Sequence, residues 1–454
     1  MNASLHIVIL AAGKGTRMYS KLPKVLHQIG GLPLVQHVIN TAQSLEPASI
    51  QVVIGHGKEQ VQAQIQSDVS WVVQDQQLGT GHAVKCALPN LPKDGKTLIL
   101  YGDVPLTDAE TLQQLLLQAG NEVGLLTDIL DNPQGLGRII RNEQGSCAIV
   151  EEKDATPEQK AITEINTGIL VLPNSHLEKW LATLQNSNAQ GEYYLTDVIA
   201  LAVADGITVH GMTVRESHLA AGINNKLQLA EIERLYQLNQ ARALMTAGVT
   251  MRDPNRFDLR GSLSHGQDCI FDVGVVVEGT CVLGDDVQIG AHCVLNNVTI
   301  GSGCHIAPFS HLSDCVVGSD ARIGPFARLR PNAHLGNDVH IGNFVEVKNT
   351  TIGNGSKVNH LTYIGDASIG TESNIGAGSI TCNYDGVNKF KTVIGDQVRI
   401  GSGTMMVAPV NIGDKATTGA GSVITKDCPA GQLTIGRARQ VSIDKWQRPE
   451  KDSK

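Results

Sequence analysis

Two cationic side chains follow a glycine-rich turn near the start of the chain. The turn reads LAAGKGTRM at residues 10–18, comes directly after an apolar run, and is followed by LPK at residues 22–24. Backbone N–H groups of such a turn can hold a phosphate, and Arg17 and Lys24 could neutralise a triphosphate. A plain tight turn explains the glycines equally well. The segment is not a Walker loop, because no Gly-Lys-Ser/Thr closes it, nor a GxGxxG motif, because position 18 is Met.

A carboxylate stands at the end of another apolar run. The segment YGDVPL occupies residues 101–106, and Asp103 is expected where the predicted strand ends. A hard carboxylate at this edge of a sheet suits Mg²⁺, which takes one or two protein oxygens together with phosphates. For an isolated aspartate before a turn, a purely structural role is the simpler interpretation.

The first half of the chain alternates short apolar runs with segments of helical spacing. Strands are predicted at residues 6–10, 51–54, 71–73 and 97–101, and helices at residues 34–45 and 107–119. This alternation favours an α/β fold with a parallel sheet that helices cover on both faces. One long amphipathic helix is predicted at residues 226–247, where Gly248 ends it, and is interpreted as a connector.

The chain after residue 250 follows a six-residue rule. Aliphatic–glycine pairs start at positions 283, 289, 300, 317, 323, 335, 341, 369, 375, 394, 400 and 412. Within runs these positions differ by six, which is typical of the hexapeptide repeats of a parallel β-helix. Each repeat supplies one short strand whose aliphatic side chain points inward.

Five cysteines follow the same period. Each stands two residues before an aliphatic repeat position, where a small inward-facing side chain is needed; they are Cys269, Cys281, Cys293, Cys304 and Cys315. Free cysteine behaves as a small hydrophobic residue, whereas metal ligands cluster at shorter spacings. These cysteines are therefore predicted to be core residues.

One segment breaks the period. The sequence TCNYDGVNKFKT at residues 381–392 contains no aliphatic–glycine pair. A polar loop inserted into a regular solenoid is either a functional element or a tolerated surface insertion, and the segment alone fits both.

Composition excludes several classes of protein. The chain of 454 residues carries 36 basic and 44 acidic residues, a net charge of −8, which disfavours general binding to nucleic acids or anionic membranes. No apolar run is long enough to span a membrane, and the first residues lack the basic region of a signal peptide. Nine cysteines without a CxxC pair fit a reducing compartment. A cytoplasmic protein with no nucleic-acid or membrane partner is therefore expected.

The motifs of the first half, LAAGxGTRM, LPK and GDxPL, resemble the sugar-phosphate nucleotidyltransferase family. Together with NHLTYIGD and ITCNYDG in the repeat region, nearly the whole chain resembles the bacterial bifunctional N-acetylglucosamine-1-phosphate uridyltransferase / glucosamine-1-phosphate N-acetyltransferase family. This resemblance implies an α/β Rossmann-like nucleotidyltransferase domain followed by a left-handed parallel β-helix of hexapeptide repeats. The implied domains are uridyltransferase at 1–225, linker helix at 226–249, and acetyltransferase with a C-terminal tail at 250–454.

The resemblance implies a UTP and sugar site in the first half. Uridyl transfer to N-acetylglucosamine 1-phosphate would need Arg17 and Lys24 as catalytic cations, and Mg²⁺ held by Asp103 and Asn224. UTP and the UDP-sugar would be bound by Leu10, Ala11, Ala12, Gly13, Lys24, Gln74, Gly79, Thr80, Tyr101, Gly137, Glu151, Asn166 and Asn224. Taken alone, Glu151 could also belong to an exposed turn, and Asn166 could cap a loop.

Acetyl transfer from a thioester to an amine needs a base, oxyanion donors and cations for the substrate phosphate. By the resemblance His360 is the base, although a single histidine in a solenoid is more often structural. Glucosamine 1-phosphate would be bound by Arg330, Lys348, Tyr363 and Asn374. Acetyl-CoA would be bound by Ala377, Asn383, Tyr384, Ser402, Ala420 and Arg437. The family is homotrimeric, with acetyl-transfer sites between subunits.

Arg330 and Lys348 lie 18 residues apart, which is three hexapeptides. If one coil takes three strands, as in the family, the two cations stack on one face. The alternative is a solvated face of the solenoid.

Three hypotheses follow. The first is a two-reaction enzyme that makes UDP-N-acetylglucosamine, a precursor for peptidoglycan and lipopolysaccharide. The second is a single-activity nucleotidyltransferase with a regulatory or oligomerising β-helix, which would have no reason to carry His360, Asn383, Tyr384 and Lys348. The third is a scaffold without catalysis, which residues 13–24 and Asp103 argue against.

Overall fold

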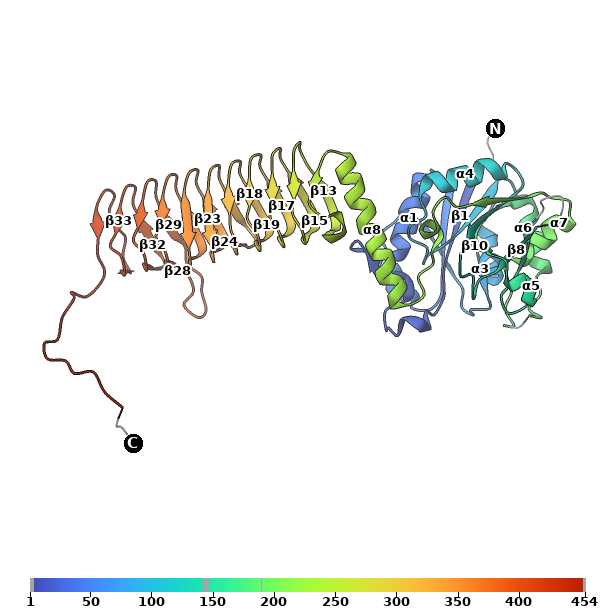
Figure 1. Cartoon of the computed structure of the whole chain (residues 1–454), viewed down its shortest axis with the longest axis horizontal. Helices are drawn as coiled ribbons and strands as arrows, with labels where there is room; N and C mark the ends of the chain where they lie inside the picture. Colours follow the sequence, from blue (N-terminus) through green and yellow to red (C-terminus); the bar gives the residue numbers. More distant parts are fainter. Residues whose placement is uncertain (1–3, 142–146, 189, 452–454) are drawn as a thin grey trace. The chain divides into compact units, whose positions relative to one another are not determined.

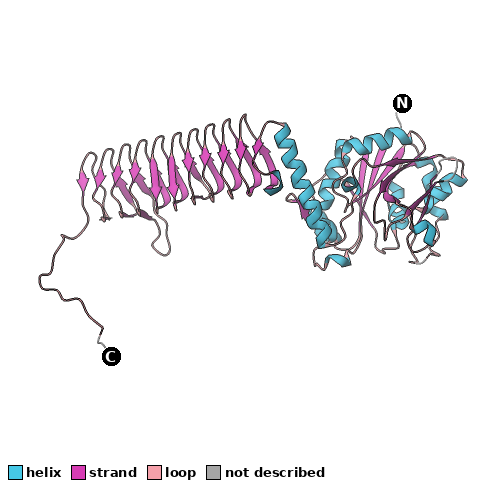
Figure 2. Cartoon of the chain, viewed as in Figure 1, coloured by secondary structure: helices cyan, strands magenta, loops and turns pink. Residues whose placement is uncertain are grey.

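The computed structural model describes residues 4–141, 147–188 and 190–451 (Figure 1). The chain forms two compact units, Met1–Tyr236 and Gln237–Lys454. Their boundary falls inside helix α8 (Lys226–Thr246), which occupies the position of the predicted long helix. Figure 2 shows that the first unit mixes helices and strands, whereas the second is built almost entirely of strands.

The first unit is built on one sheet, in which the order of the seven strands on the main path is β11-β7-β10-β6-β1-β4-β5. The strand bounds, including the side pair β8–β9 and a small separate hairpin, are β1 Leu5–Ala11, β2 Gln28–Ile29, β3 Leu32–Pro33, β4 Ser49–Ile54, β5 Ser70–Val73, β6 Lys96–Tyr101, β7 Val123–Ile129, β8 Arg138–Arg141, β9 Cys147–Val150, β10 Glu164–Pro173 and β11 Val209–Thr213. The four predicted strands are all present, as β1, β4, β5 and β6.

The prediction of a parallel sheet holds for the neighbouring strands β1, β4, β5 and β6 but not for β10. Strand β10 runs antiparallel to both of its main neighbours, β6 and β7, while β1, β4, β5 and β6 pair in parallel. Hydrophobic runs in β10 are as continuous as those of a parallel strand, because both of its faces are buried, so the pattern does not reveal direction.

Helices cover the two faces of this sheet. Alternate residues of β1 point to opposite sides, so Ile7 and Ile9 join one core and Val8 and Leu10 join the other. The first core contains residues of α1, α2 and α4, and the second contains residues of α3, α6 and α7. The helix bounds are α1 Leu34–Ser44, α2 Lys58–Gln64, α3 Thr80–Ala87, α4 Ala109–Ala119, α5 Pro157–Lys160, α6 Asn174–Thr183 and α7 Asp197–Ala204.

Helix α4 begins two residues later than predicted. The side chain of Asp108 accepts a hydrogen bond from the backbone N–H of Thr111 at 2.8 Å, which makes Asp108 the N-cap. An aspartate cap satisfies a backbone donor that the first turn of a helix leaves free.

The second unit is a parallel β-helix of hexapeptide repeats, the arrangement expected for the left-handed family of such folds. One sheet contains β12 Thr250–Met251, β14 Ile270–Phe271, β16 Gln288–Ile289, β18 His305–Ile306, β20 Arg322–Ile323, β23 His340–Asn343, β25 Lys357–His360, β27 Asn374–Ile375, β30 Arg399–Ile400, β33 Thr417–Thr418 and β35 Leu433–Thr434. A second contains β13 Phe257–Ser264, β15 Val275–Leu283, β17 Val294–Ile300, β19 His311–Val317, β21 Arg328–Leu329, β22 Ala333–Leu335, β24 Glu346–Ile352, β26 Tyr363–Ile369, β28 Ile380–Cys382, β29 Thr392–Ile394, β31 Met405–Val407, β32 Val410–Ile412 and β34 Val423–Ile424.

Each coil places its residues directly over those of the coil before. Phe257 pairs with Val275, and Gln288 pairs with His305, so one turn takes 18 or 17 residues. The inserted segment lengthens one coil: Tyr363 pairs with Ile380 after 17 residues, but Ile380 pairs with Met405 after 25. In Figure 1 the loop after β28 projects from the side of the solenoid.

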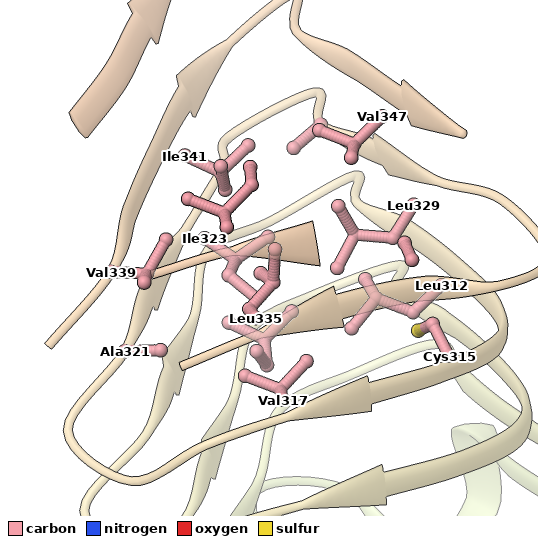
Figure 3. Close-up of a cluster of buried hydrophobic side chains, with 14 of the residues drawn as sticks. Leu312, Cys315, Val317, Ala321, Ile323, Leu329, Leu335, Val339, Ile341 and Val347 are labelled. Carbon is pink, nitrogen blue, oxygen red and sulfur yellow. The ribbon is translucent and has the colours of Figure 1, made fainter. Parts of the chain in front are cut away.

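The interior of the β-helix is a column of aliphatic side chains (Figure 3). Leu312, Leu329 and Val347 stack on one side, and Ile323 and Ile341 stack on another. The prediction for the five repeat cysteines is confirmed, because all five are buried within this core. Burial raises the pKa of the Cys293 thiol to about 11, as expected for an inert core residue.

Within the described residues, no helix is both long enough and apolar enough to cross a membrane.

Candidate active sites

A cavity of about 680 Å³ opens at the carboxyl end of β1 in the first unit. Its wall contains many of the residues predicted for UTP: Leu10, Ala11, Ala12, Gly13, Arg17, Lys24, Gln74, Gly79, Thr80, Tyr101 and Asp103. The carboxyl ends of β1 and β6 lie side by side, which brings the glycine-rich turn to Asp103. A cavity of this size accommodates a small-molecule ligand.

Gly15 allows the glycine-rich turn to close over Lys24. The backbone of Gly15 has a φ of +59°, and an added Cβ would lie 2.5 Å from Cβ of Lys24. Glycine is therefore needed both for its conformation and for the close approach. Lys24 itself forms part of the cavity wall.

The Lys24 ammonium lies between two oxygens from distant parts of the chain. Its Nζ donates to the carboxylate of Asp103 and to Oδ1 of Asn224, the latter at 3.2 Å. The side chains of Lys24 and Asp103 are 14% and 17% exposed. A carboxylate and an amide oxygen that already share one cation form a donor set that fits Mg²⁺.

Gln74 is held with its amide nitrogen facing the protein. The residue is only 3% exposed, and its Nε2 donates to the carbonyl of Gly79 at 3.1 Å and lies 3.0 Å from Nδ1 of His82. Gly79 has a φ of +105°, and a Cβ there would lie 2.6 Å from the carbonyl oxygen of Tyr193. A side chain is thus excluded at Gly79.

Thr80, the first residue of α3, follows this glycine. Its Oγ1 accepts a hydrogen bond from the backbone N–H of Leu195 at 3.1 Å. The hydroxyl proton of Thr80 can therefore be donated to a ligand in the cavity.

The residues predicted for the sugar lie together beside the cavity. The backbone N–H of Asn166 donates to the carbonyl of Gly137 at 2.9 Å, and a Cβ on Gly137 would lie 3.4 Å from Oε2 of Glu151. The Asn166 side chain accepts from the N–H of Gly168 at 2.8 Å, which holds a local turn. The Gly168 position in turn abuts the ring of Tyr101.

Glu151 is half-buried, which argues against the exposed-turn interpretation. Burial raises its pKa, and the nearby charges of Asp197 and Asp154 raise it further, while a hydrogen bond from Thr196 opposes the shift. Burial and the charge of Asp103 likewise raise the pKa of Tyr101, so this phenol stays protonated and can donate a hydrogen bond.

In the second unit, His360 is the last residue of β25, and its side chain is exposed on the outside of the β-helix. Its Nδ1 lies 3.2 Å from Oδ1 of Asn343 on the preceding coil. An amide oxygen only accepts, so this contact places the imidazole proton on Nδ1 and leaves Nε2 with a free lone pair.

The same turn position continues through the following coils. The N–H of Gly378 donates to the carbonyl of His360 at 3.1 Å, that of Gly403 to Ala377 at 2.7 Å, and that of Gly421 to Ser402 at 2.8 Å. These bonds define one stack, hereafter the His360 stack, of Asn343, His360, Ala377, Ser402 and Ala420. It unites the predicted base with three of the residues predicted for acetyl-CoA.

Three cationic side chains of the second unit, Arg330, Lys348 and Lys389, lie close to one another. Leu329 pairs with Val347, so the following coil places Lys348 over Arg330, whose Nη1 donates to Oε1 of Glu346 at 2.7 Å. A contact with Lys389, together with its charge, lowers the pKa of Lys348, and burial and Arg330 lower it further. Cations that repel one another in this way form a site for an anion.

Lys389 was not predicted from the sequence. It belongs to the segment 381–392, whose broken period marked an insertion but did not single out a residue. A cation in an otherwise non-periodic loop was the available signal.

The remaining predicted residues are less closely grouped. Asn383 is buried and donates to Asp366, and Tyr384, 60% exposed, donates to Gly386 within the loop. Tyr363 lies on β26, where Gly365 leaves room for its hydroxyl, and Asn374 lies on β27.

Arg437 follows β35 on the surface, and within the described part of the chain it makes no hydrogen bond to the other predicted residues. Among the described residues, no cluster of three His, Cys, Asp or Glu side chains could hold a metal ion.

Models of known protein families match segments of both units. A family model described as MobA-like NTP transferase domain matches residues 7–131. A model for the bacterial transferase hexapeptide, six repeats, matches residues 280–314, and one for the GMPPB C-terminal domain matches residues 312–415.

Curated relatives match the chain along its length. A protein of Neisseria meningitidis serogroup B named bifunctional protein GlmU is 65% identical over 99% of both chains. Proteins of the same name from Chromobacterium violaceum and Stutzerimonas stutzeri are 63% and 58% identical over 99% of this chain and 99% and 100% of theirs.

Proposed function

Because this chain belongs to the GlmU family, and is both an N-acetylglucosamine-1-phosphate uridyltransferase and a glucosamine-1-phosphate N-acetyltransferase, we propose that each compact unit carries out one reaction. The α/β unit would transfer UMP and the β-helix unit would transfer the acetyl group. The supporting observation is that the polar residues gather in two separate sets, one in each unit.

Uridyl transfer begins with the sugar 1-phosphate beside the triphosphate of UTP. A phosphate oxygen of N-acetylglucosamine 1-phosphate attacks the α-phosphorus, the bond to the β-phosphate breaks, and diphosphate leaves with the negative charge. The backbone of residues 10–13 would hold the phosphates, and Arg17 and Lys24 would neutralise the charge that develops. Positioning accounts for much of the remaining acceleration.

Asp103 and Asn224 would hold Mg²⁺, which neutralises phosphate charge when bound. With the nucleotide in the cavity, Lys24 would turn from these two oxygens toward the phosphates. Gln74, Gly79 and Thr80 would contact the uracil ring. Gly137, Glu151 and Asn166 would hold the sugar, with Tyr101 as a hydrogen-bond donor.

Acetyl transfer uses the His360 stack. Nε2 of His360 takes a proton from the amine of glucosamine 1-phosphate, which attacks the thioester carbonyl; the C–S bond then breaks and coenzyme A leaves as thiolate. Asn343 keeps the imidazole in the tautomer that this step requires. Ala377, Ser402 and Ala420 would line the acetyl-CoA site above the base, with Asn383, Tyr384 and Arg437 contributing contacts.

The phosphate of glucosamine 1-phosphate would be held by Arg330, Lys348 and Lys389. Tyr363 and Asn374 would contact the sugar. The hexapeptide-repeat fold is consistent with a homotrimer, in which a second subunit would complete the site around the exposed His360. Static light scattering tests the oligomeric state, and a monomer with full acetyltransferase activity would contradict it. A cytoplasmic location is proposed because UTP and acetyl-CoA are available there.

A single assay tests the proposal. The protein is incubated with glucosamine 1-phosphate, acetyl-CoA, UTP and Mg²⁺, and UDP-N-acetylglucosamine is the expected product. An Asp103→Ala variant should accumulate N-acetylglucosamine 1-phosphate, and a His360→Ala variant should make no product unless N-acetylglucosamine 1-phosphate is supplied. Loss of both half-reactions in either variant would argue against separate sites.

A further inference from the structure

We infer that His82 is a positioning residue that fixes the side-chain amide of Gln74 and thereby selects a nucleobase with an N–H at position 3, uridine over cytidine. The inference rests on the proposed function in one point, namely that Gln74 contacts the base. His82 itself is half-buried on α3 and does not line the cavity, so its effect passes through Gln74.

The orientation of the Gln74 amide follows from its neighbours. The carbonyl oxygen of Gly79 can only accept a hydrogen bond, so the amide atom 3.1 Å from it must be the nitrogen. If the amide were reversed, two oxygens would face each other at this distance. The same nitrogen lies 3.0 Å from Nδ1 of His82.

His82 takes up the second amide proton. An amide nitrogen carries two hydrogens and has no lone pair to accept with, so Nδ1 of His82 must be the acceptor. Its proton then resides on Nε2, which lies 3.9 Å from Sγ of Cys86. Gly79 and His82 together occupy both N–H groups of Gln74.

Only the amide oxygen of Gln74 is left to face the ligand. Within the described residues, Oε1 of Gln74 accepts no hydrogen bond, yet it is not among the buried polar atoms that lack a partner. The oxygen therefore opens to solvent, and Gln74 is part of the cavity wall. The side chain presents a pure acceptor.

A pure acceptor distinguishes the two pyrimidines. Uracil carries a hydrogen on N3 and can donate it to Oε1, whereas cytosine has a lone pair on N3, which Oε1 would repel. Sites that hydrogen-bond one polar group discriminate strongly against an analogue that cannot make the bond. Without His82, one N–H of Gln74 becomes free to turn toward the base, and cytosine can then be accepted.

The test compares kcat/KM for UTP and for CTP in the full-length chain. His82→Leu and His82→Phe remove the acceptor, and the second keeps a ring of similar volume; each should lower the UTP-to-CTP ratio about tenfold or more. His82→Asn keeps an acceptor, Oδ1, at the position of Nδ1 and should retain the ratio. Cys86→Ala, which removes the neighbour of Nε2 without touching Gln74, should leave the ratio unchanged.

Two outcomes separate this inference from the proposed function. An unchanged ratio in both His82→Leu and His82→Phe, with thermal unfolding like that of the parent, would overturn the role of His82. If the parent protein transfers no UMP, or if Gln74→Ala leaves kcat/KM for UTP unchanged, the proposed uridine site itself is wrong. Acetyl transfer by the same preparations reports that the chain is folded.

Discussion

Lys24 donates a hydrogen bond through its ammonium to the carboxylate of Asp103, although 79 residues separate them in the sequence. The lysine thus occupies the place that the proposed function gives to a divalent cation. One side chain would serve two positions, at the carboxylate in the free protein and at the phosphates when the nucleotide is bound.

Replacement of Lys24 by Met should strengthen metal binding to the free protein. Because the ammonium no longer competes for Asp103, we expect the affinity for Mn²⁺, a Mg²⁺ substitute, to rise about tenfold. Electron paramagnetic resonance of free Mn²⁺ measures this directly. Uridyl transfer should nevertheless fall by about a hundredfold. Lys14→Met removes the same charge from the wall of the same cavity and should change Mn²⁺ affinity much less; equal effects would point to net charge alone.

Loss of the His360 imidazole should separate the two activities. His360→Ala is expected to slow acetyl transfer by about 10²- to 10⁴-fold, because the amine proton then has no acceptor. Release of coenzyme A thiol provides the assay, and UMP transfer to N-acetylglucosamine 1-phosphate should stay at the parent rate. Asn343→Ala should have a smaller effect, since the imidazole remains but loses its fixed tautomer. His305→Ala, on another coil, is the control; a similar loss there would contradict a specific role.

Lys389 should control the pH dependence of phosphate binding. Its contact with Lys348 lowers the pKa of Lys348, so Lys348 loses its charge at a lower pH than an ordinary lysine. We therefore expect KM for glucosamine 1-phosphate to rise as pH increases through that lowered pKa. In Lys389→Met the rise should move to higher pH, although binding at neutral pH becomes weaker. Lys391→Met should retain the parent profile, and an identical profile in Lys389→Met would be evidence against the coupling.

Glu151 should destabilise the folded state at neutral pH while it contributes to sugar binding. Burial raises its pKa, so the folded state binds the proton more tightly than the unfolded state does. At neutral pH the ionised carboxylate destabilises the fold, and this effect fades as pH falls through the raised pKa. Glu151→Gln should therefore raise the melting temperature most at neutral pH and weaken binding of N-acetylglucosamine 1-phosphate. Calorimetry across pH tests this, with the exposed Glu178→Gln as control; a lower melting temperature would refute it.

Periodicity in the sequence predicted those parts of the fold in which equivalent positions of the repeat have the same surroundings. The six-residue phase located the strands and inward cysteines of the β-helix, because every coil repeats the same demand for a small or aliphatic side chain. In the first unit, continuous apolar runs predicted β1, β4, β5 and β6. They could not show that β10 runs antiparallel, because burial of both faces removes the alternation that would distinguish its direction.

The sites were less accessible from sequence than the fold. Asn224 lies 200 residues from Lys24, and only the folded chain brings them together. The His360 stack has steps of 17, 25 and 18 residues from His360 to Ala420, so the inserted loop conceals it from a fixed period. His82 belongs to no motif in the sequence. It contacts Gln74 because it lies in the first turn of α3, close to the end of the loop that follows β5.

The His360 stack also depends on the number of coils between its members. Neighbouring strands lie about 4.8 Å apart, so each coil adds this distance along the axis of the β-helix unit. A coil inserted before Asn343 would shift all five members together and preserve their spacing. A coil inserted between His360 and Ala377 would move the proposed base one coil farther from the proposed acetyl-CoA site. The number of coils before Asn343 can therefore vary without changing the His360 stack, whereas the number of coils between its members cannot.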